Sequence, residues 1–175
     1  MCHCMKAQVI LVNERDEETG LMEKMEAHEK GLLHRAFSVF IMNDQGEMLL
    51  QQRALDKYHS GGLWTNACCS HPLPGETVEA ATHRRLSEEM GFDCPLRELF
   101  QFTYRTEFDN GLIEHEYDHV WVGVYNGAIN PDPGEVHAFH YLPVEEIDRQ
   151  LTANPQQFTS WFRLAFSRVI DKLRE

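Results

Sequence analysis

Residues 76–92 read ETVEAATHRRLSEEMGF. The apolar and small side chains of this stretch recur with the spacing of a helix that buries one face; they are Val78, Ala81, Thr82, Leu86 and Met90. Gly91 follows at once, where a helix commonly takes a left-handed cap. The pattern therefore predicts a helix over residues 78–90.

This predicted helix carries charges of both signs on one face. Arg85, Glu88 and Glu89 stand at positions i, i+3 and i+4, so their side chains can pair. Taken alone, such pairs are typical of a solvent-exposed helix surface, and each contributes only about 0.3–0.5 kcal/mol. A role in binding needs support from the rest of the chain.

Short apolar runs rich in strand-forming residues lie on both sides of the helix. They are residues 36–42, 48–53, 63–70, 99–104 and 119–125. The turn residues 43–46 predict a hairpin between the first two runs, and residues 130–134 predict a loop. Residues 141–146 fit a strand end that passes into a helix with Pro143 in its first turn, and residues 159–173 predict an amphipathic helix. Strands with interspersed helices indicate one layered α/β or α+β domain.

Composition excludes several classes of protein. The 175 residues carry a formal charge of −12, which disfavours binding to nucleic acid, so an anionic small substrate needs a local basic cluster or a bridging metal. No apolar run approaches the roughly 20 residues that span a bilayer, and residues 1–15 do not resemble a signal peptide. We therefore expect a cytoplasmic protein that binds neither nucleic acid nor membrane.

The five cysteines are a poor disulfide framework, because their number is odd and two are adjacent; they are Cys2, Cys4, Cys68, Cys69 and Cys94. We expect reduced thiols. The terminal Cys2-His3-Cys4 run has no partner cluster and is assigned no role.

Residues 64–72, WTNACCSHP, place two thiols beside a histidine. If the segment is extended, side chains alternate, so Cys69 and His71 face one way and Cys68 faces the other. Only one thiol can then face a site. A buried structural cysteine is the usual role of such a residue, and both interpretations stay open at this point.

Glu114-His115-Glu116 follows the turn at residues 109–111. In a strand the two carboxylates project from the same face, where they repel unless a cation, a shared proton or solvent intervenes. A solvated acidic strand edge is the plain alternative. With His28, His34 and His71 they would form a set of three imidazoles and two carboxylates, suited to Mn²⁺, Zn²⁺ or Mg²⁺.

The spacing of residues 70–92 resembles the Nudix box. The matching residues are Glu76, Arg84, Glu88, Glu89 and Gly91. Two positions depart from the pattern, because Ser70 stands at the leading glycine and Arg85 replaces the glutamate that follows Arg84. In Nudix hydrolases that glutamate helps to bind metal around a cleaved diphosphate. The reversed charge at Arg85 therefore counts against hydrolysis.

A longer series of motifs, in order along nearly the whole chain, resembles the type 1 isopentenyl-diphosphate isomerases, which have the Nudix fold. The motifs are residues 21–24 with His28, 33–38, 52–57, 64–66, 69–72, 104–105 and 114–116. The resemblance implies a Nudix-like mixed β-sheet layered between helices in a single α/β (α+β) domain over residues 1–175. It also implies that about residues 1–30 partly cover the site.

The resemblance implies specific roles for individual residues. Cys69 and Glu116 would be the catalytic pair, with Tyr104 hydrogen-bonded to the carboxylate. One divalent metal, Mn²⁺, Mg²⁺ or Zn²⁺, would be held by His28, His34, His71, Glu114 and Glu116. Glu89 would serve a Mg²⁺ that arrives with the substrate diphosphate. The substrate itself would contact Lys24, Arg53, Lys57, Arg85 and Trp161.

The implied reaction interconverts isopentenyl diphosphate and dimethylallyl diphosphate through a tertiary carbocation. The expected partner is thus a small-molecule diphosphate, and the expected state is a monomer or weak dimer. A Nudix pyrophosphohydrolase acting on a diphosphate-containing small molecule is the first alternative. A non-catalytic metal-binding module that retains the fold is the second.

Overall fold

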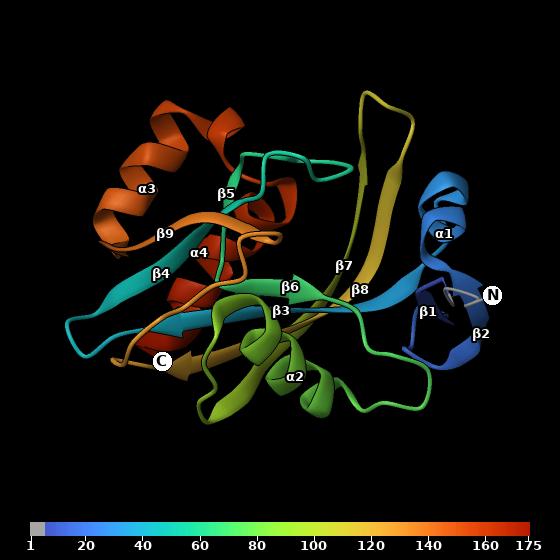
Figure 1. Ribbon diagram of the computed structural model, residues 1–175, viewed down its shortest axis with the longest axis horizontal. Helices are drawn as coiled ribbons and strands as arrows, with labels where there is room; N and C mark the ends of the chain where they lie inside the picture. Colours follow the sequence, from blue (N-terminus) through green and yellow to red (C-terminus); the bar gives the residue numbers. More distant parts are fainter. Residues whose placement is uncertain (1–5) are drawn as a thin grey trace.

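Strand β3 (His34–Met42) lies at the centre of a mixed sheet in the computed structural model, which describes residues 6–175 (Figure 1). It runs parallel to β8 (Ile113–Val124) and antiparallel to the short β6 (Cys68–Ser70). Strand β7 (Leu96–Glu107) pairs along the length of β8, and the two form a long hairpin that projects beyond the rest of the sheet. The Cys2-His3-Cys4 run lies outside the described residues.

The remaining elements complete two helical layers and an N-terminal unit. They are β1 (Gln8–Val12), β2 (Glu18–Glu23), α1 (Lys24–Lys30), β4 (Glu47–Arg53), β5 (Trp64–Thr65), α2 (Val78–Met90), β9 (Val136–Pro143), α3 (Val144–Ala153), the short 3-10 helix η1 (Pro155–Gln157) and α4 (Ser160–Arg174). The predicted α/β (α+β) architecture, a mixed sheet layered between helices, is confirmed by this arrangement.

The predicted hairpin between β3 and β4 exists only at its turn. Asn43 closes the turn by accepting the backbone N–H of Gly46 and, through its side chain, that of Glu47. Beyond the pair Met42 and Met48 the strands separate. The flanks of β3 are taken by β8 and β6, so β4 pairs instead with β9 and β5.

The single strand predicted for residues 63–70 is wrong, because the segment is broken into β5 and β6. The break lies at Asn66, whose side-chain amide donates to the carbonyls of Val39 and Cys68, both at 3.0 Å. These side-chain bonds replace the strand ladder at that point. The two short strands therefore pair with different neighbours, β4 and β3.

Helix α2 has the predicted bounds, Val78–Met90. Thr77 caps its N-terminus by accepting the N–H of Ala80. Gly91 ends the helix with φ 73°, and a Cβ there would lie 2.1 Å from the carbonyl oxygen of Asn130. Both the positive φ and the close approach require glycine at this position.

The C-terminal helices agree with prediction except at one end. The predicted helix over residues 159–173 is α4, with Thr159 as its N-cap. Pro143, however, belongs to β9 and precedes α3 as its cap residue, so it is not in the first helical turn. Its extended conformation, ψ 142°, turns the chain out of the strand before the helix begins.

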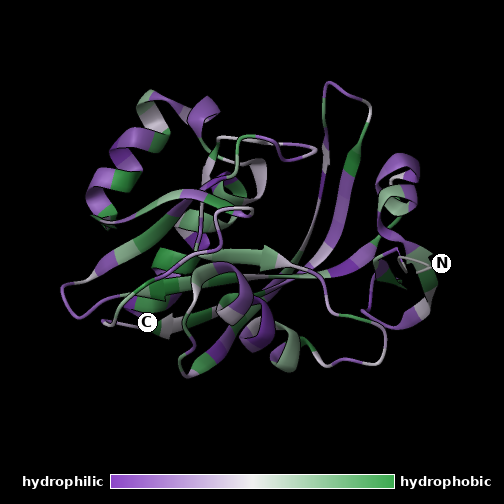
Figure 2. Cartoon of the chain, in the orientation of Figure 1, coloured by the Kyte–Doolittle hydropathy of each residue, from purple (hydrophilic) through white to green (hydrophobic). Residues whose placement is uncertain are grey.

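Two hydrophobic cores lie on opposite faces of the sheet. On one face Phe37, Val39 and Ile41 of β3 pack against α2. On the other, Phe40 packs with residues of α3 and α4. Hydrophobic residues gather in this central region, whereas the part of β8 that rises beside α1 is hydrophilic (Figure 2). Polar groups thus occupy the end of the sheet beside α1.

No helix within residues 6–175 is long and apolar enough to cross a membrane.

The N-terminal unit has no counterpart among the elements predicted from the sequence. The β1–β2 hairpin and α1 lie beside the projecting part of β8 (Figure 1). The Asp16 carboxylate links the hairpin to the sheet. Its Oδ1 lies 2.7 Å from Arg35 Nε on β3, and its Oδ2 lies 2.9 Å from His119 Nε2 on β8. Because α1 is only seven residues long, its position depends on these tertiary contacts more than on helix propensity.

Candidate active site

A polar cavity opens where α1, the β7–β8 hairpin, β6 and the loop after β4 meet. Its walls include most of the residues expected to act in catalysis and binding: Lys24, Arg53, Lys57, Cys69, His71, Arg85, Glu89, Tyr104, Glu114, Glu116 and Trp161. His28 and His34 are fully buried and lie within metal-binding distance of its carboxylates. The folded chain therefore gathers residues that are up to about 140 positions apart into one place.

The two adjacent cysteines face opposite sides of the sheet, as their alternation predicts. Cys68 is fully buried in the core beneath α2, whereas Cys69 lines the cavity with His71. The thiol of Cys69 donates to Asn66 Oδ1 at 3.1 Å and lies 3.5 Å from Ser38 Oγ. Cys68, Cys69 and Cys94 are all unpaired, in agreement with the expected reduced thiols.

The surroundings of Cys69 keep its thiol protonated. Burial raises the pKa of Cys69, and the nearby carboxylate of Asp118 raises it further. Asp118 is itself fully buried and accepts the hydroxyl of Ser38 at 2.7 Å. Burial and the charge of Glu116 raise the pKa of Asp118 well above its ordinary value. At neutral pH the side chain of Cys69 is thus a thiol and not a thiolate.

Glu114 and Glu116 point from the same face of β8, as predicted. Both lie at the Tyr104 hydroxyl, which is 2.9 Å from Glu116 Oε2 and 3.2 Å from Glu114 Oε2. Burial and the neighbouring charge of Glu116 raise the pKa of Glu114. Burial acts the same way on Glu116, but the neighbouring imidazoles of His34 and His71 outweigh it and hold its pKa well below the ordinary value. The two carboxylates therefore differ in proton affinity.

Imidazoles surround these carboxylates in two overlapping groups. In the first, His28, His34, His71 and Glu116 offer ligand atoms that all lie within 4.8 Å of one another. In the second, His28, His59 and Glu114 do so. The predicted five-residue metal set is thus brought together, with Glu114 joined to the others through His28, whose Nε2 lies 4.0 Å from Glu114 Oε1.

The chemistry of this donor set fits a divalent cation. His28 Nδ1 donates to the backbone oxygen of Lys24 at 2.7 Å, and His34 Nδ1 donates to that of Leu32 at 2.8 Å. A carbonyl oxygen only accepts, so each ring presents the lone pair of Nε2 to the site. Both Nε2 atoms are buried without a hydrogen-bond partner. Burial also lowers the pKa of His28 to about 4 and of His71 to about 3, which keeps both rings neutral.

The predicted substrate-binding cations line the same cavity, and we call this group, Lys24, Arg53, Lys57 and Arg85, the cationic wall. The Lys24 ammonium lies 4.7 Å above the ring of Tyr58, and the Arg53 guanidinium lies 5.3 Å from the ring of Trp161. Burial lowers the pKa of Lys24, and the charges of Lys57 and Arg53 lower it further. Several positive charges therefore share this wall and repel one another until an anion is bound.

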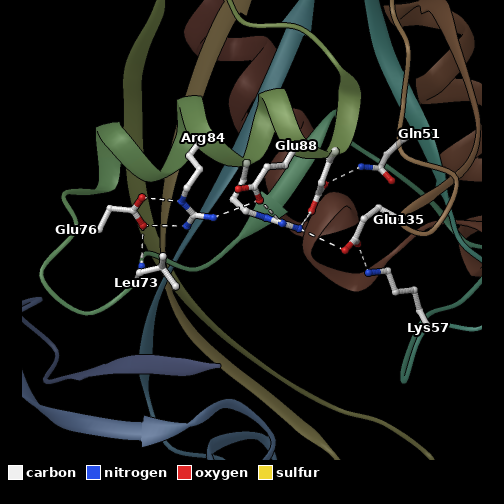
Figure 3. Close-up of polar contacts among 9 residues, drawn as sticks. Gln51, Lys57, Leu73, Glu76, Arg84, Glu88 and Glu135 are labelled. Atoms are coloured by element: carbon white, nitrogen blue, oxygen red, sulfur yellow. Dashed lines mark hydrogen bonds and ion pairs between the residues drawn. The ribbon is translucent and has the colours of Figure 1, made fainter. Parts of the chain in front are cut away.

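Arg85 pairs with the carboxylates of helix α2. Figure 3 shows the ion pairs on either side of it, between Arg84 and Glu76 and between Lys57 and Glu135. The Arg85 guanidinium lies 2.6 Å from Glu88 and 2.6 Å from Glu89, and 3.5 Å from Glu135. Glu135 also pairs with Lys57, so one carboxylate that was not predicted links two predicted cations. Glu89 is nine-tenths buried and lines the cavity, outside both His/Glu groups.

Several residues at the site were assigned no role from the sequence; they are Ser38, Asn66, Tyr58, His59, Asp118 and Glu135. His59 lies in the segment between β4 and β5, where no periodicity marks a site. Asp118 had a usable signal, because it continues the alternation of Glu114 and Glu116 on the same strand face.

Comparison with known proteins gives a consistent result. The model of the NUDIX domain matches residues 32–162. The chain is 54% identical over 164 residues to an isopentenyl-diphosphate Delta-isomerase of Pectobacterium atrosepticum, with 94% of this chain and 92% of the relative covered. It is 49% identical over 165 residues to an enzyme of the same name from Burkholderia multivorans, with 94% of each covered.

Solved structures agree on the fold. A crystal structure of a Deinococcus radiodurans protein has a TM-score of 0.70 and 22% identity, covering 84% of this chain and 90% of that chain. A MutT protein of Methanosarcina mazei has a TM-score of 0.67 and 18% identity, covering 82% and 96%. At such low identity these likenesses establish the fold alone.

Proposed function

The chain belongs to the Nudix family, among its isopentenyl-diphosphate Delta-isomerases, and from this premise we propose that Cys69 and Glu116 carry the proton transfers. The activity is the interconversion of isopentenyl diphosphate and dimethylallyl diphosphate. Both side chains line the same cavity, where a small diphosphate can reach them together.

The reaction moves a double bond by adding and removing protons at different carbons. A proton adds to the terminal alkene carbon, which leaves a tertiary carbocation, and a proton then leaves the methylene carbon on the other side of that centre. The path needs an acid and a base on opposite sides of a flat carbon skeleton. Atoms balance without any other reactant.

The proposed acid and base come from different strands that line the cavity. Cys69 on β6 is a protonated thiol, and Glu116 on β8 is a carboxylate whose pKa is held low by His34 and His71. The observation that carries the proposal is that this thiol and this carboxylate, from β6 and β8, line the same cavity. Tyr104 donates to Glu116 and fixes the orientation of the carboxylate.

We propose that His28, His34, His71, Glu114 and Glu116 hold one divalent cation. The mixture of imidazole and carboxylate donors suits Mn²⁺, Mg²⁺ or Zn²⁺. When bound, such a cation supplies positive charge that sets the proton affinity of Glu116 and fixes its position. The residues around it keep the neutral imidazoles and the carboxylate in place through the backbone bonds of His28 and His34.

The diphosphate is proposed to bind at the cationic wall. Lys24, Arg53, Lys57 and Arg85 offer the positive charge that the acidic chain as a whole does not. Glu89 would contact a Mg²⁺ carried by the diphosphate. Binding energy at this remote group positions the alkene between Cys69 and Glu116, so its loss affects turnover as well as affinity.

Trp161 is proposed to face the carbocation. Its ring is 97% buried in the cavity wall, and an aromatic face stabilises a desolvated cation by about 2 kcal/mol without capturing it. Water would add to the cation and give an alcohol, so the site must exclude it. The segment that carries Lys24 and His28 is proposed to form part of the cover.

Arg85 argues against hydrolysis of the diphosphate. It neutralises Glu88 and Glu89 on the helix that binds metal in Nudix hydrolases. The carboxylate cluster that such an enzyme needs is therefore replaced by an ion-paired one. A hydrolase would release phosphate, and this release is the discriminating observation.

The test is an NMR assay with isopentenyl diphosphate, Mg²⁺ and Mn²⁺ in deuterated buffer. We expect wild type to form dimethylallyl diphosphate that carries solvent deuterium, and Cys69→Ala and Glu116→Gln to lose this conversion. Tyr117→Phe, on the same strand but hydrogen-bonded to Gln101 on the exposed face, is the matched control and should retain it. Conversion that persists in both variants would refute the pair, and phosphate release would refute the reaction.

We also propose that the protein is cytoplasmic and a monomer or weak dimer. Two adjacent free thiols, Cys68 and Cys69, fit a reducing compartment. Cell fractionation tests the location, and sedimentation over a range of concentrations tests the assembly state. Recovery in an oxidising compartment or a tight oligomer would contradict these assignments.

A further inference from the structure

We propose that His59 is an additional ligand of the divalent cation, on the side of the ion where Glu114 lies. The inference rests on the proposed metal site and extends it by a residue that neither the sequence motifs nor the family resemblance supplied. It concerns only this chain's own side chains.

The position of the His59 imidazole carries the proposal. Its Nε2 lies 3.3 Å from Glu114 Oε1, and the Nε2 of His28 lies 4.0 Å from the same oxygen. Two atoms that bind one ion at about 2.1 Å lie roughly 3.0 Å apart at a right angle and 4.2 Å apart on opposite sides. The observed separations fall within this range.

The Nε2 atom of His59 faces the Glu114 carboxylate at 3.3 Å without forming a well-directed hydrogen bond to it. The residue is only 6% exposed, and Nε2 is buried without a hydrogen-bond partner. A buried polar atom of this kind costs free energy unless a partner satisfies it. The same condition holds for the Nε2 atoms of His28 and His34, so three unsatisfied imidazole nitrogens surround the two glutamates.

Packing holds the ring in this orientation. Phe108 stacks on it with ring centroids 4.5 Å apart, and Tyr58 meets its edge at the same distance. Its other nitrogen, Nδ1, lies 3.1 Å from Ser60 Oγ, which can accept the N–H and leave the Nε2 lone pair free. These contacts with Phe108, Tyr58 and Ser60 orient the His59 ring so that its Nε2 points toward Glu114.

Two glycines permit the conformation of the loop that carries His59. A Cβ on Gly61 would lie 2.6 Å from the carbonyl oxygen of Leu55, and Gly62 has φ 77°. Gly62 donates its N–H to the carbonyl of Arg53, which closes the loop. Both glycines are thus required to bring the imidazole back to the cavity.

The two His/Glu groups would bind one shared ion and not two separate ions. They share His28, whose Nδ1 donates to the carbonyl of Lys24, so only the Nε2 lone pair is left. One lone pair cannot bind two ions. With one ion bound, His28 would belong to both groups, and His59 and Glu114 would join His34, His71 and Glu116 in holding it.

His59 also joins the ion to the substrate side of the cavity. Its carbonyl oxygen accepts from Arg53 Nη2 at 3.3 Å, and its ring meets that of Trp161 edge-on at 5.9 Å. Binding of His59 to the ion would fix the position of its loop, which contacts Arg53 and Trp161, two of the residues proposed to bind the substrate. Loss of His59 should therefore weaken metal binding strongly and substrate binding to a smaller extent.

The experiment uses Co²⁺ alone as the probe, with the full chain freed of metal. In proton NMR, each imidazole that binds Co²⁺ through Nε2 gives one strongly shifted, exchangeable Nδ1–H resonance. We expect one equivalent of Co²⁺ to bind wild type. His59→Gln should lose one such resonance and bind Co²⁺ at least about tenfold more weakly. His140→Gln, which removes a ring stacked on Trp64, should lose neither.

A gentler variant covers the case in which His59→Gln does not fold. Ser60→Ala keeps the imidazole but removes the partner of its Nδ1, and it should move one shifted resonance while the others stay in place. An unchanged spectrum in Ser60→Ala together with an unchanged spectrum in His59→Gln overturns the proposal. Binding of two Co²⁺ equivalents overturns the single shared ion.

His34→Gln separates failure of this inference from failure of the metal site. If wild type binds no Co²⁺, or if His34→Gln keeps every resonance, the proposed metal site itself fails. If His34→Gln loses a resonance and His59→Gln keeps all of them at unchanged affinity, only the role of His59 is wrong.

Discussion

The hydroxyl of Tyr104 on β7 lies 2.9 Å from the carboxylate of Glu116, directly opposite on β8. The proposed base is therefore oriented by a neighbour whose place the strand register fixes. A hydrogen bond to a charged group contributes about 1.5–3 kcal/mol. The phenol, which is also 3.2 Å from Glu114, holds two buried carboxylates at once.

Tyr104→Phe should lower kcat about tenfold to a hundredfold and leave KM nearly unchanged, because the phenol does not belong to the cationic wall. Steady-state kinetics with isopentenyl diphosphate measure both constants. Tyr117→Phe removes an exposed hydroxyl on the same sheet and should alter neither. A change in KM alone would show that Tyr104 serves substrate binding instead.

The two cysteines should respond differently to the same substitution. Cys69→Ala should reduce kcat by at least about a hundredfold, because it removes a group that transfers a proton. Cys68→Ala should keep most activity but lower stability by about 1 kcal/mol, since its sulfur fills a buried position beneath α2. Steady-state kinetics and thermal unfolding of both variants test this contrast. An inactive but fully stable Cys68→Ala variant would contradict the assignment of catalysis to Cys69.

Arg84 and Arg85 are adjacent but have different surroundings. Arg84 pairs with Glu76 and lies away from the cavity, whereas Arg85 lines it. We expect Arg84→Gln to lower the Tm and keep kcat/KM. Arg85→Gln should raise KM and lower kcat, with kcat/KM reduced about tenfold or more, because it removes charge from the diphosphate wall. Equal kinetic loss in both variants would contradict the separate roles.

Sequence reasoning recovered the elements with strong local signals and missed those that depend on tertiary pairing. The helical spacing that begins at Val78, together with Gly91 after Met90, predicted the bounds of α2 correctly. The break between β5 and β6 was missed because it depends on Asn66 bonding to the distant Val39. No local pattern reports such a contact.

The candidate site shows the same division. The alternation of Cys68 and Cys69, and that of Glu114 and Glu116, follows from strand geometry and is observed. His59 and Glu135 reach the site from loops. Their contacts depend on loop conformation, which is set by close backbone approaches such as that of Gly61 to Leu55.

The ion pair between Glu76 and Arg84 should give the fold a measurable sensitivity to acid. Two hydrogen bonds join the side chains, at 2.7 and 2.9 Å, and Glu76 also accepts the N–H of Leu73. The bonds from Arg84 lower the pKa of Glu76, against a smaller opposing effect of burial. The carboxylate therefore binds its proton less readily in the folded chain than in the unfolded one.

The sign of the effect follows from this order of pKa values. The stabilisation is fully present above the unfolded pKa, about 4.3, and is lost as the pH falls through the lower folded value. Glu76→Gln should thus lower stability by about 0.5–1 kcal/mol near pH 7, or roughly 1–4 °C in Tm for a domain of this size. Thermal unfolding of both proteins from pH 3 to pH 7 should show the difference shrinking toward acid. Because protonation elsewhere affects both proteins alike, a difference that stays constant with pH would show that the Glu76 carboxylate is not the group responsible.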